Sequence, residues 1–406
     1  MIELNYSNKL LLKVKSLLII TCILNCAIYS NCQDNSYNDN YLNNKTNKAL
    51  VLLDDWLLIQ SHSLFWNQIK HLNYELEFKT IDDSNIKLDY YGEKLYDIII
   101  LYIPSFTEED SKMSSFSVKK IVKYFDEGHN IMIIADKHVN SYIRSLSTEF
   151  GIDFDDYNSQ VKDSLYLHKN DLNLNADFIK MNTNTISITK NVTPIKNVFR
   201  QTNSYILYEG IGLEIDVHNK YAFPILSADE NAYSVNSENE IFYNVGEKIK
   251  LVAGYQGRNN KRVTILGSYT LCSNKFYYLS SSKEQKTNFD PLNSPNALLC
   301  EDIINWNFEK TGILAYNNIK HHKLPEEITL ETYRVKDDIE YMVDIFEFDY
   351  KNNIWKPYLT DDLQIEFTMM DPFYRIQMKI KSPNKPTYYT SFKVIKITIY
   401  YLFYII

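Results

Sequence analysis

Short apolar runs alternate with amphipathic stretches from residue 49 onwards. The runs at 49–53, 98–103 and 131–135 have the composition of strands that are buried on both faces of a parallel sheet. Between and after them, apolar residues recur at helical spacing, which predicts helices over 64–72, 118–125 and 142–150. Strands that alternate with helices predict an α/β fold with a parallel sheet of flavodoxin-like or amidotransferase-like layout.

The pattern changes twice further along the chain. Residues 155–250 are less regular, and we interpret them as a β-rich excursion from the α/β domain. Apolar runs then resume, and a helix from about 296 to 308 closes a domain that spans 49–314. From 328 to 406 apolar and polar residues alternate between short polar turns, which predicts an antiparallel β-sandwich domain. The polar stretch 314–327 is the predicted boundary.

The N-terminus has the pattern of a targeting segment. Three lysines precede an apolar run at 17–24, so residues 1–30 are predicted to be a secretory signal peptide, with an uncleaved signal anchor as the alternative. The Asn-rich stretch 31–48 is predicted to be a disordered spacer. At the other end, the apolar tail 397–406 is shorter than the ~20 residues of a membrane helix. It is interpreted as a buried edge strand or as the start of an incomplete span.

Composition narrows the classes of partner. The 406 residues carry a formal net charge of −8, and no dense basic face is evident, which excludes nucleic acid as an expected partner. Of the five cysteines, only Cys272 and Cys300 lie in the predicted folded part. An oxidising compartment would permit a disulfide between them, and buried free thiols are the alternative. Asn44 and Asn191 begin Asn-x-Thr tripeptides and are candidate glycosylation acceptors, although Pro194 follows the second.

Candidate reactive residues are few, and a structural reading is favoured for each. No Gly-x-Ser-x-Gly elbow is present, and Cys272 lacks the flanking glycines of a nucleophile turn. His62 lies between two serines, but a partly buried histidine at a helix start is the simpler interpretation. The same holds for acids at strand ends, a short glycine loop, a turn arginine and a histidine pair, which are Asp54, Asp55, Asp136, Gly210–Gly212, Arg258, His321 and His322. We therefore predict no catalytic, cofactor-binding or metal-binding residue.

Several segments, taken together and in order, resemble the 48 kDa subunit family of the eukaryotic oligosaccharyltransferase. They cover roughly residues 48–375, and the most specific are the stretches 50–54, 61–65, 91–97, 253–260 and 361–367. The resemblance implies a lumenal α/β domain, a β-rich domain and a C-terminal membrane helix. It also implies work within the complex that transfers an oligosaccharide from dolichyl diphosphate to Asn-x-Ser/Thr acceptors. In that family catalysis belongs to a different, multi-spanning subunit.

The resemblance therefore predicts a non-catalytic subunit at the lumenal side of the endoplasmic reticulum membrane, with other subunits of the complex as partners and no cofactor. After about Tyr389 the family pattern is lost, so the β domain is predicted to be incomplete at its C-terminus. A misplaced exon boundary is the interpretation we favour. Two alternatives stay open from the sequence, namely a stand-alone lumenal carbohydrate-binding module and an amidotransferase-like enzyme.

Overall fold

The computed structural model describes residues 47–80, 83, 86–103, 116–163, 186–195, 198–201, 204–236, 241–280, 290–326, 329–330, 333–334, 336–368, 372–383, 385–394 and 402–405. The predicted signal peptide, Asn44 and most of the predicted spacer lie outside these residues. Two residues of the spacer do not, because the first strand already begins at Asn47. Among the described helices, none combines the length and the apolar character that crossing a bilayer requires.

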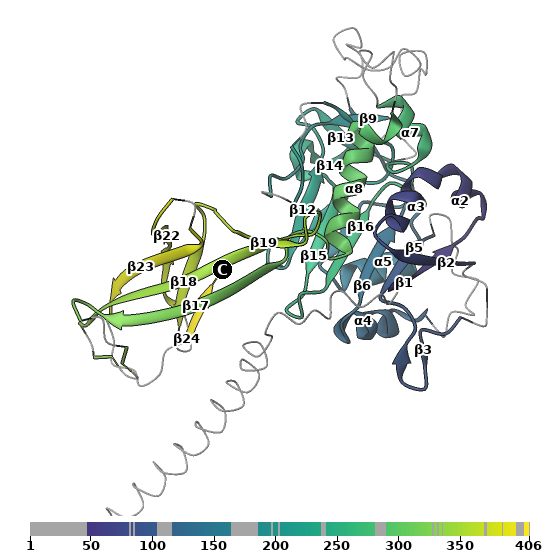
Figure 1. Cartoon of the computed structure of the whole chain (residues 1–406). Coiled ribbons are helices and arrows are strands. Elements are labelled where there is room, and N and C mark those ends of the chain that lie inside the picture. The colour runs from purple at the N-terminus through teal and green to yellow at the C-terminus, as the bar shows by residue number, and fades with distance from the viewer. Residues whose placement is uncertain are drawn as a thin grey trace, which may run out of the picture. The chain divides into compact units, whose positions relative to one another are not determined.

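Nine strands form the main sheet (Figure 1). Five neighbouring strands are parallel, in the order β2 (Tyr74–Thr80), β1 (Asn47–Leu53), β5 (Ile98–Tyr102), β6 (Asn130–Ile134) and β16 (Arg262–Leu266). The sheet continues with antiparallel neighbours, namely β15 (Lys250–Gln256), β11 (Leu213–Ile215) and β7 (Ile152–Phe154), while β12 (Ala222–Ser227) also pairs with β15. The predicted α/β fold is confirmed, but the sheet is mixed, because a tight turn joins β15 to β16 and such a turn can only connect antiparallel strands.

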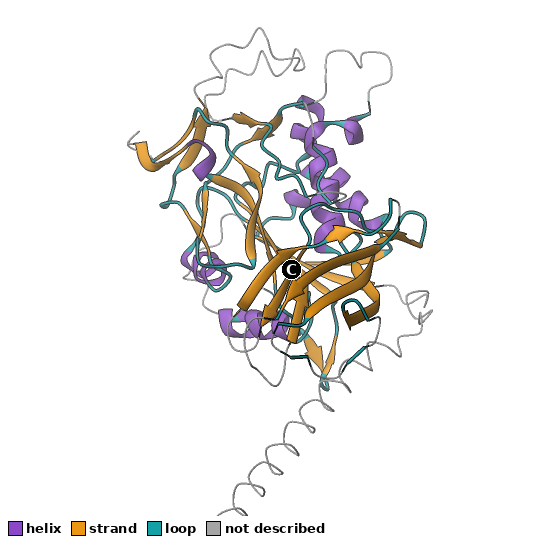
Figure 2. Cartoon of the chain, turned by 90° about the vertical axis from the view of Figure 1, so that its left-hand side faces the viewer, coloured by secondary structure: helices purple, strands orange, loops and turns teal. Residues whose placement is uncertain are grey.

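Helices cover both faces of this sheet (Figure 2). Alternate residues of β1 explain why, since Ala49, Val51 and Leu53 enter one core while Leu50 and Leu52 enter the other. The first core is covered by α2 (Leu57–Ser61), α3 (Ser63–Lys70), α7 (Asn274–Leu279) and α8 (Pro295–Asn307). The second is covered by α4 (Val118–Asp126) and α5 (Ser141–Thr148). The continuous apolar character of β1, β5 and β6 follows from burial on both sides.

The predicted excursion at 155–250 is rich in strands, but they do not form one unit. Two small sheets lie there, made of β8 (Gln160–Asp163), β13 (Ala232–Val235) and β14 (Ile241–Val245), and of β9 (Ser187–Thr189) and β10 (Ile206–Tyr208). Strands β11 and β12 instead join the main sheet. Single-turn 3-10 helices lie at Gly246–Lys248 and Pro291–Asn293, and a short hairpin is formed by β3 (Asp89–Tyr90) and β4 (Glu93–Lys94).

An antiparallel β domain follows. One sheet has the order β17 (Leu314–Lys323), β18 (Asp338–Asp349), β23 (Thr387–Lys393) and β22 (Lys379–Ile380), with β19 (Ile354–Pro357) beside β18. The second has the order β21 (Pro372–Gln377), β20 (Gln364–Thr368) and β24 (Leu402–Ile405). Side chains of β18, β20 and β23 share one core, as in the predicted sandwich. The predicted boundary differs from the structure, because the polar stretch 314–327 contains β17, an edge strand with mostly exposed side chains.

Candidate functional site

The carboxyl ends of β1, β5, β6 and β16 are where an open α/β sheet usually holds a ligand. In this chain a buried polar cluster lies there. The imidazole Nε2 of His62 lies 2.9 Å from the carbonyl oxygen of Tyr269, and the Tyr102 hydroxyl donates to the same oxygen at 2.8 Å. The His62 and Tyr102 rings meet edge to face, with centroids 5.1 Å apart. The polar groups at this edge are thus bonded to the chain's own backbone.

His62 is more buried than the sequence predicts, with 1% of its surface exposed between α2 and α3. Both ring nitrogens lie near a carbonyl oxygen, Nε2 at 2.9 Å from Tyr269 and Nδ1 at 3.2 Å from Leu58. We assign the proton of the neutral ring to Nε2, which has the shorter carbonyl contact, and this leaves Nδ1 to accept from the Ser61 hydroxyl at 2.8 Å. Burial lowers the pKa of His62 to about 4, although its contacts with the Tyr269 and Leu58 carbonyls oppose the shift. The imidazole is therefore neutral at neutral pH and is a weak base for activating Ser61.

The hydroxyl groups that follow β16 are also hydrogen-bonded to the chain's own backbone. The Ser268 and Thr270 hydroxyls donate to the carbonyl oxygen of Glu209, at 2.6 and 3.2 Å. The loop before β11 passes so close that a Cβ atom at Gly210 would lie 2.2 Å from the Gly267 oxygen. A side chain cannot fit there, which gives the Gly-Ile-Gly sequence a packing role and agrees with its interpretation as a tight loop.

The predicted strand-end acids have mixed surroundings. Asp55 accepts from the Leu57 backbone N–H at 2.9 Å and so helps to begin α2. Burial raises the pKa of Asp136 above its usual value, and the Lys137 backbone N–H opposes this shift. Across the part of the chain that the structure describes, no group of three His, Cys, Asp or Glu side chains is arranged to hold a metal ion.

Helix α8 is fixed to the layer beneath it by a disulfide. The structure joins Cys272, just before α7, to Cys300 within α8, and their Cα atoms lie 5.9 Å apart. Asn296 supports the same end of the helix, because its side chain bonds to the Leu207 N–H and to the Leu207 and Leu271 carbonyls at 2.8–3.0 Å. Nothing reactive is exposed at this point, since both cysteines and Asn296 are buried.

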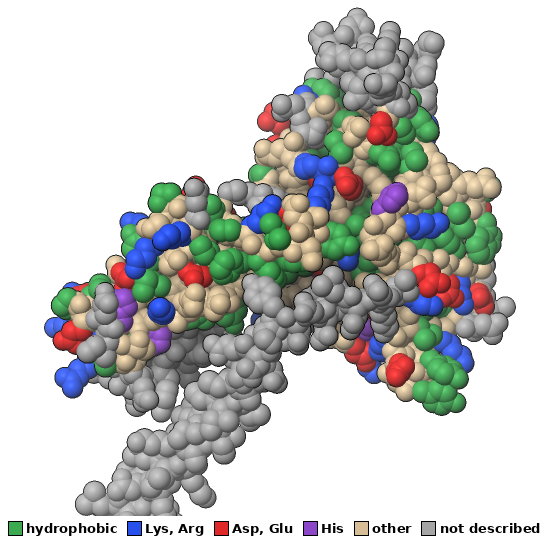
Figure 3. All heavy atoms as spheres, viewed as in Figure 1, with side chains coloured by type: hydrophobic (Ala, Val, Ile, Leu, Met, Phe, Trp, Pro, Cys, Tyr) green, Lys and Arg blue, Asp and Glu red, His purple; other side chains and the backbone are tan. Residues whose placement is uncertain are grey.

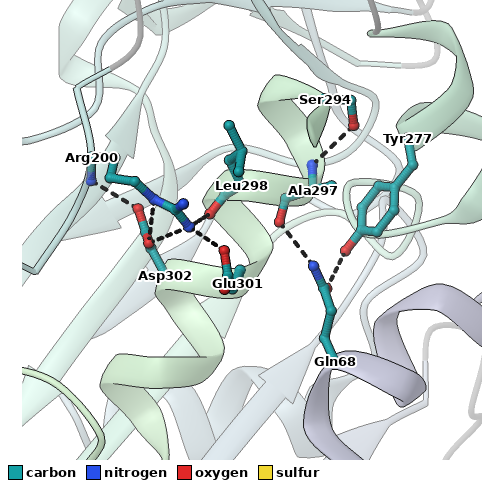
Figure 4. A network of polar contacts seen from close by, with 8 residues as sticks. All are labelled: Gln68, Arg200, Tyr277, Ser294, Ala297, Leu298, Glu301 and Asp302. Atoms are coloured by element: carbon teal, nitrogen blue, oxygen red, sulfur yellow. Dashed lines mark hydrogen bonds and ion pairs between the residues drawn. The ribbon is translucent and has the colours of Figure 1, made fainter. Parts of the chain in front are cut away.

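A polar network holds the remainder of α8 (Figure 4). Arg200 Nε and its backbone N–H each donate to the Asp302 carboxylate at 2.8 Å. Arg200 Nη2 also reaches Glu301 at 2.5 Å and the Leu298 carbonyl at 3.0 Å. On the other side, Gln68 of α3 donates to the Ala297 carbonyl at 3.2 Å and accepts from the Tyr277 hydroxyl at 2.9 Å. The network ties α8 directly to α3 and to the segment that contains Arg200, and Tyr277 of α7 joins it through Gln68.

The other residues singled out in the sequence have partners outside the polar cluster at the carboxyl edge. The Asn191 side chain is half-buried, and its Nδ2 donates to the Ala228 carbonyl at 2.9 Å. Arg258 lies in the exposed β15–β16 turn, where its Nε donates to the Tyr221 hydroxyl at 2.6 Å. His321 and His322 are neighbours on β17. They have different partners, since His321 bonds to Tyr333 at 2.7 Å while His322 lies 3.9 Å from Glu340.

Most of the residues that form the polar cluster at the carboxyl edge or the network around α8 were not identified from the sequence. Tyr102 lies in a continuous apolar strand, where a tyrosine is counted as a hydrophobic residue, and Tyr269 contributes only a backbone oxygen. Arg200 and Asp302 are widely separated in sequence. Among these residues, only Asn296 lies beside a recognisable sequence feature, because it follows the Ser294-Pro295 start of α8, and its amide is buried.

Both folded parts of the chain are similar in sequence to known proteins. The model of the OST48 N-terminal domain matches residues 40–310, and the model of the OST48 middle domain matches residues 320–400. The chain is 32% identical over 356 residues to the dolichyl-diphosphooligosaccharide–protein glycosyltransferase 48 kDa subunit of Arabidopsis thaliana, covering 86% of this chain and 77% of that protein. It is 29% identical over 351 residues to the Drosophila melanogaster protein of that name, covering 85% and 76%.

Solved structures show weaker similarity. A glutamine amidotransferase from Thermotoga maritima is 10% identical with a TM-score of 0.34, over 65% of this chain and 97% of that one. A carbohydrate deacetylase is 9% identical with a TM-score of 0.28, over 55% and 29%. Neither value supports an inference about function. Because the two domain models match both folded parts in order, the chain belongs to the OST48 family.

Proposed function

We propose that this chain is a non-catalytic subunit of the oligosaccharyltransferase complex. In this proposal it supports assembly of the complex, and thereby the transfer of oligosaccharide from dolichyl diphosphate to Asn-x-Ser/Thr acceptors. Its partners are the other subunits, including the catalytic multi-spanning one, and it needs no cofactor. The relatives are named as 48 kDa subunits of the dolichyl-diphosphooligosaccharide–protein glycosyltransferase and are similar over most of their length, which supports membership in that complex.

The state of the carboxyl edge is the observation that carries the non-catalytic part of the proposal. In α/β enzymes this edge presents reactive side chains. Here His62 and Tyr102 are both hydrogen-bonded to the Tyr269 carbonyl oxygen, and the Ser268 hydroxyl donates to the Glu209 carbonyl oxygen. Burial also keeps the Tyr102 hydroxyl protonated, because it raises the pKa well above 10. These groups stabilise the scaffold and are poorly suited to acid–base or nucleophilic work.

Depletion and reconstitution test the proposal. Depleting the chain from its own cells should lower the occupancy of Asn-x-Ser/Thr sites in secreted glycoproteins, and re-expression should restore it. The purified chain alone should not transfer oligosaccharide to an acceptor peptide. Normal occupancy after depletion would contradict the role in the complex, while transfer by the isolated chain would contradict the non-catalytic assignment.

We also propose that the chain faces the lumen of the endoplasmic reticulum, anchored to the membrane through the complex. The Cys272–Cys300 disulfide supports this, because such bonds persist in oxidising compartments. Asn44 and Asn191 are the proposed glycan acceptors. Since the Asn191 amide is hydrogen-bonded in the folded chain, we expect lower occupancy there than at Asn44. Glycosidase treatment of Asn44→Gln and Asn191→Gln variants would measure each site, and a chain with neither glycan would count against a lumenal position.

A further inference from the structure

The hairpin formed by β3 and β4 carries two exposed tyrosines at its tip. Asp89 pairs with Lys94 and Tyr90 with Glu93, which leaves Tyr91 and Gly92 as the turn. Tyr91 is 92% exposed and Tyr90 is 56% exposed, and their rings meet edge to face with centroids 4.5 Å apart. Figure 1 shows β3 projecting from the α/β domain, and Figure 3 shows apolar side chains gathered over the same hairpin in the same view.

The turn is an unusual place for tyrosine. Tyr91 has a φ of 48° and Gly92 a φ of 86°, so both central residues are in the left-handed region, as a type I′ turn requires. Asn, Asp or Gly is preferred at the first of these positions, because a large side chain makes positive φ unfavourable. The exposed Tyr91 ring does not repay this strain through burial in a core. A residue held in an unfavourable backbone conformation, with no gain in stability to offset it, is expected at a site that serves binding.

The base of the hairpin is firmly attached. Leu95 N–H donates to the Leu88 carbonyl at 3.1 Å, and Lys94 Nζ lies 2.5 Å from Glu127 at the end of α4. Directly after the hairpin, Tyr96 is buried and its hydroxyl donates to Glu77 at 2.9 Å. A tip held on such a base loses little conformational freedom on binding, which is the property of a pre-organised contact.

The charges at the tip indicate what it would contact. Asp89 and Glu93 are exposed beside the two rings, whereas Lys94 is engaged by Glu127. Tyrosine is enriched at the energetic centres of protein interfaces, and an arginine can stack on a tyrosine ring while pairing with a carboxylate. An anionic lipid surface would be repelled by the two carboxylates. The chemistry therefore fits a protein surface with an apolar pocket bordered by arginine.

We propose that Tyr90 and Tyr91 form a knob that docks into such a pocket on another protein. This rests on the proposed function, under which that protein is another subunit of the oligosaccharyltransferase complex. The knob is the point at which the α/β domain of this chain recognises that subunit. Its binding energy comes from the rings, and Asp89 and Glu93 contribute orientation and selectivity.

The decisive variant is Tyr91→Asn in the tagged full-length chain. Asn before Gly92 is the preferred type I′ sequence, so this change should keep or raise the thermal stability of the chain. Recovery of at least one complex subunit, measured by quantitative mass spectrometry after affinity purification, should nevertheless fall about 10-fold. Glu93→Lys should weaken the same association. The matched control is Tyr157→Ser, at a tyrosine that is 65% exposed elsewhere on the α/β domain, and it should leave recovery unchanged.

A photo-crosslinking amino acid at position 91 identifies the contact directly. It should crosslink to a peptide of another subunit that contains or adjoins arginine. Unchanged recovery for Tyr91→Asn would overturn the knob while leaving the proposed function intact. If the wild-type tagged chain recovers no subunit at all, the proposed function itself fails. Flotation of the wild-type chain with phosphatidylcholine–phosphatidylserine vesicles, lost in Tyr91→Asn, would assign the tip to a membrane and overturn the knob as well.

Discussion

His62 and Tyr102 share one acceptor, the carbonyl oxygen of Tyr269, which His62 Nε2 contacts at 2.9 Å and the Tyr102 hydroxyl at 2.8 Å. The two residues come from different layers, since Tyr102 ends β5 and His62 lies between α2 and α3. Their common partner follows β16, the neighbour of β6 in the sheet. The shared oxygen therefore fixes a helix pair and two strands at the edge where related folds place their chemistry.

Tyr102→Phe tests the strength of this junction. The substitution keeps the buried ring and removes one hydrogen bond, while His62 still serves the Tyr269 oxygen. The free energy of unfolding should fall by about 1 kcal/mol. Guanidinium unfolding followed by tryptophan fluorescence measures this, with Tyr157→Phe as an exposed control that should change stability by less than about 0.5 kcal/mol. A loss no larger than that of the control would show that the bond contributes nothing net.

His62 should make the folded chain sensitive to mild acid. Its pKa is about 4 in the folded chain, below the ordinary value of 6.5, because burial disfavours the charged ring. The unfolded chain therefore binds more protons between these values, and stability falls as the pH drops from 6.5 towards 4. This window corresponds to about 3 kcal/mol. The stability advantage of the wild type over His62→Gln should shrink by that amount across it.

The comparison must use the difference between the two proteins, since carboxylates also titrate near pH 4. His218→Gln is the matched control, because it removes an exposed histidine instead of a buried one. If the difference between the wild type and His62→Gln stays constant with pH, His62 is not held neutral by burial in the folded chain.

The sequence predicts the parts of this fold that depend on local patterns. Uninterrupted apolar runs identify β1, β5 and β6 because burial on both faces leaves no polar position. The edge strand β17 escapes such reasoning, since its side chains are mostly exposed and only its pairing with β18 defines it as a strand. The contacts of Tyr269 and Glu209 are equally hidden, because the acceptors are backbone oxygens and carry no side-chain signature.

Removing the disulfide should weaken the attachment of α8. The bond between Cys272 and Cys300 spans a sequence separation of 28 residues. Closing a loop of this size in the unfolded chain is worth about 3.6 kcal/mol, so Cys272→Ala/Cys300→Ala should lower the free energy of unfolding by a similar amount. Dithiothreitol should destabilise the wild type and leave the double variant unaffected. A wild type that ignores the reductant while thiol titration confirms reduction would show that the bond adds no stability.

In the Arg200–Asp302 pair, the Asp302 carboxylate is the buried charge and Arg200 is its main stabilising partner. The Asp302 side chain is 8% exposed and the Arg200 side chain 44%, so the carboxylate depends on Arg200 for most of its compensation. Arg200→Met leaves that charge with few partners, and we expect a loss of about 2 kcal/mol, below the value for a fully buried pair because solvent reaches the arginine. Combining it with Asp302→Leu should recover most of the loss, because the double variant buries no charge.

A double-mutant cycle from guanidinium unfolding measures the coupling between the two residues. Glu301→Gln is the matched control, since Glu301 contacts the same guanidinium from a more exposed position and should cost less than about 1 kcal/mol. Losses of Arg200→Met and Asp302→Leu that simply add would show that the two side chains stabilise α8 independently. The network around α8 would then have to hold the helix through the Asn296 and Gln68 bonds instead.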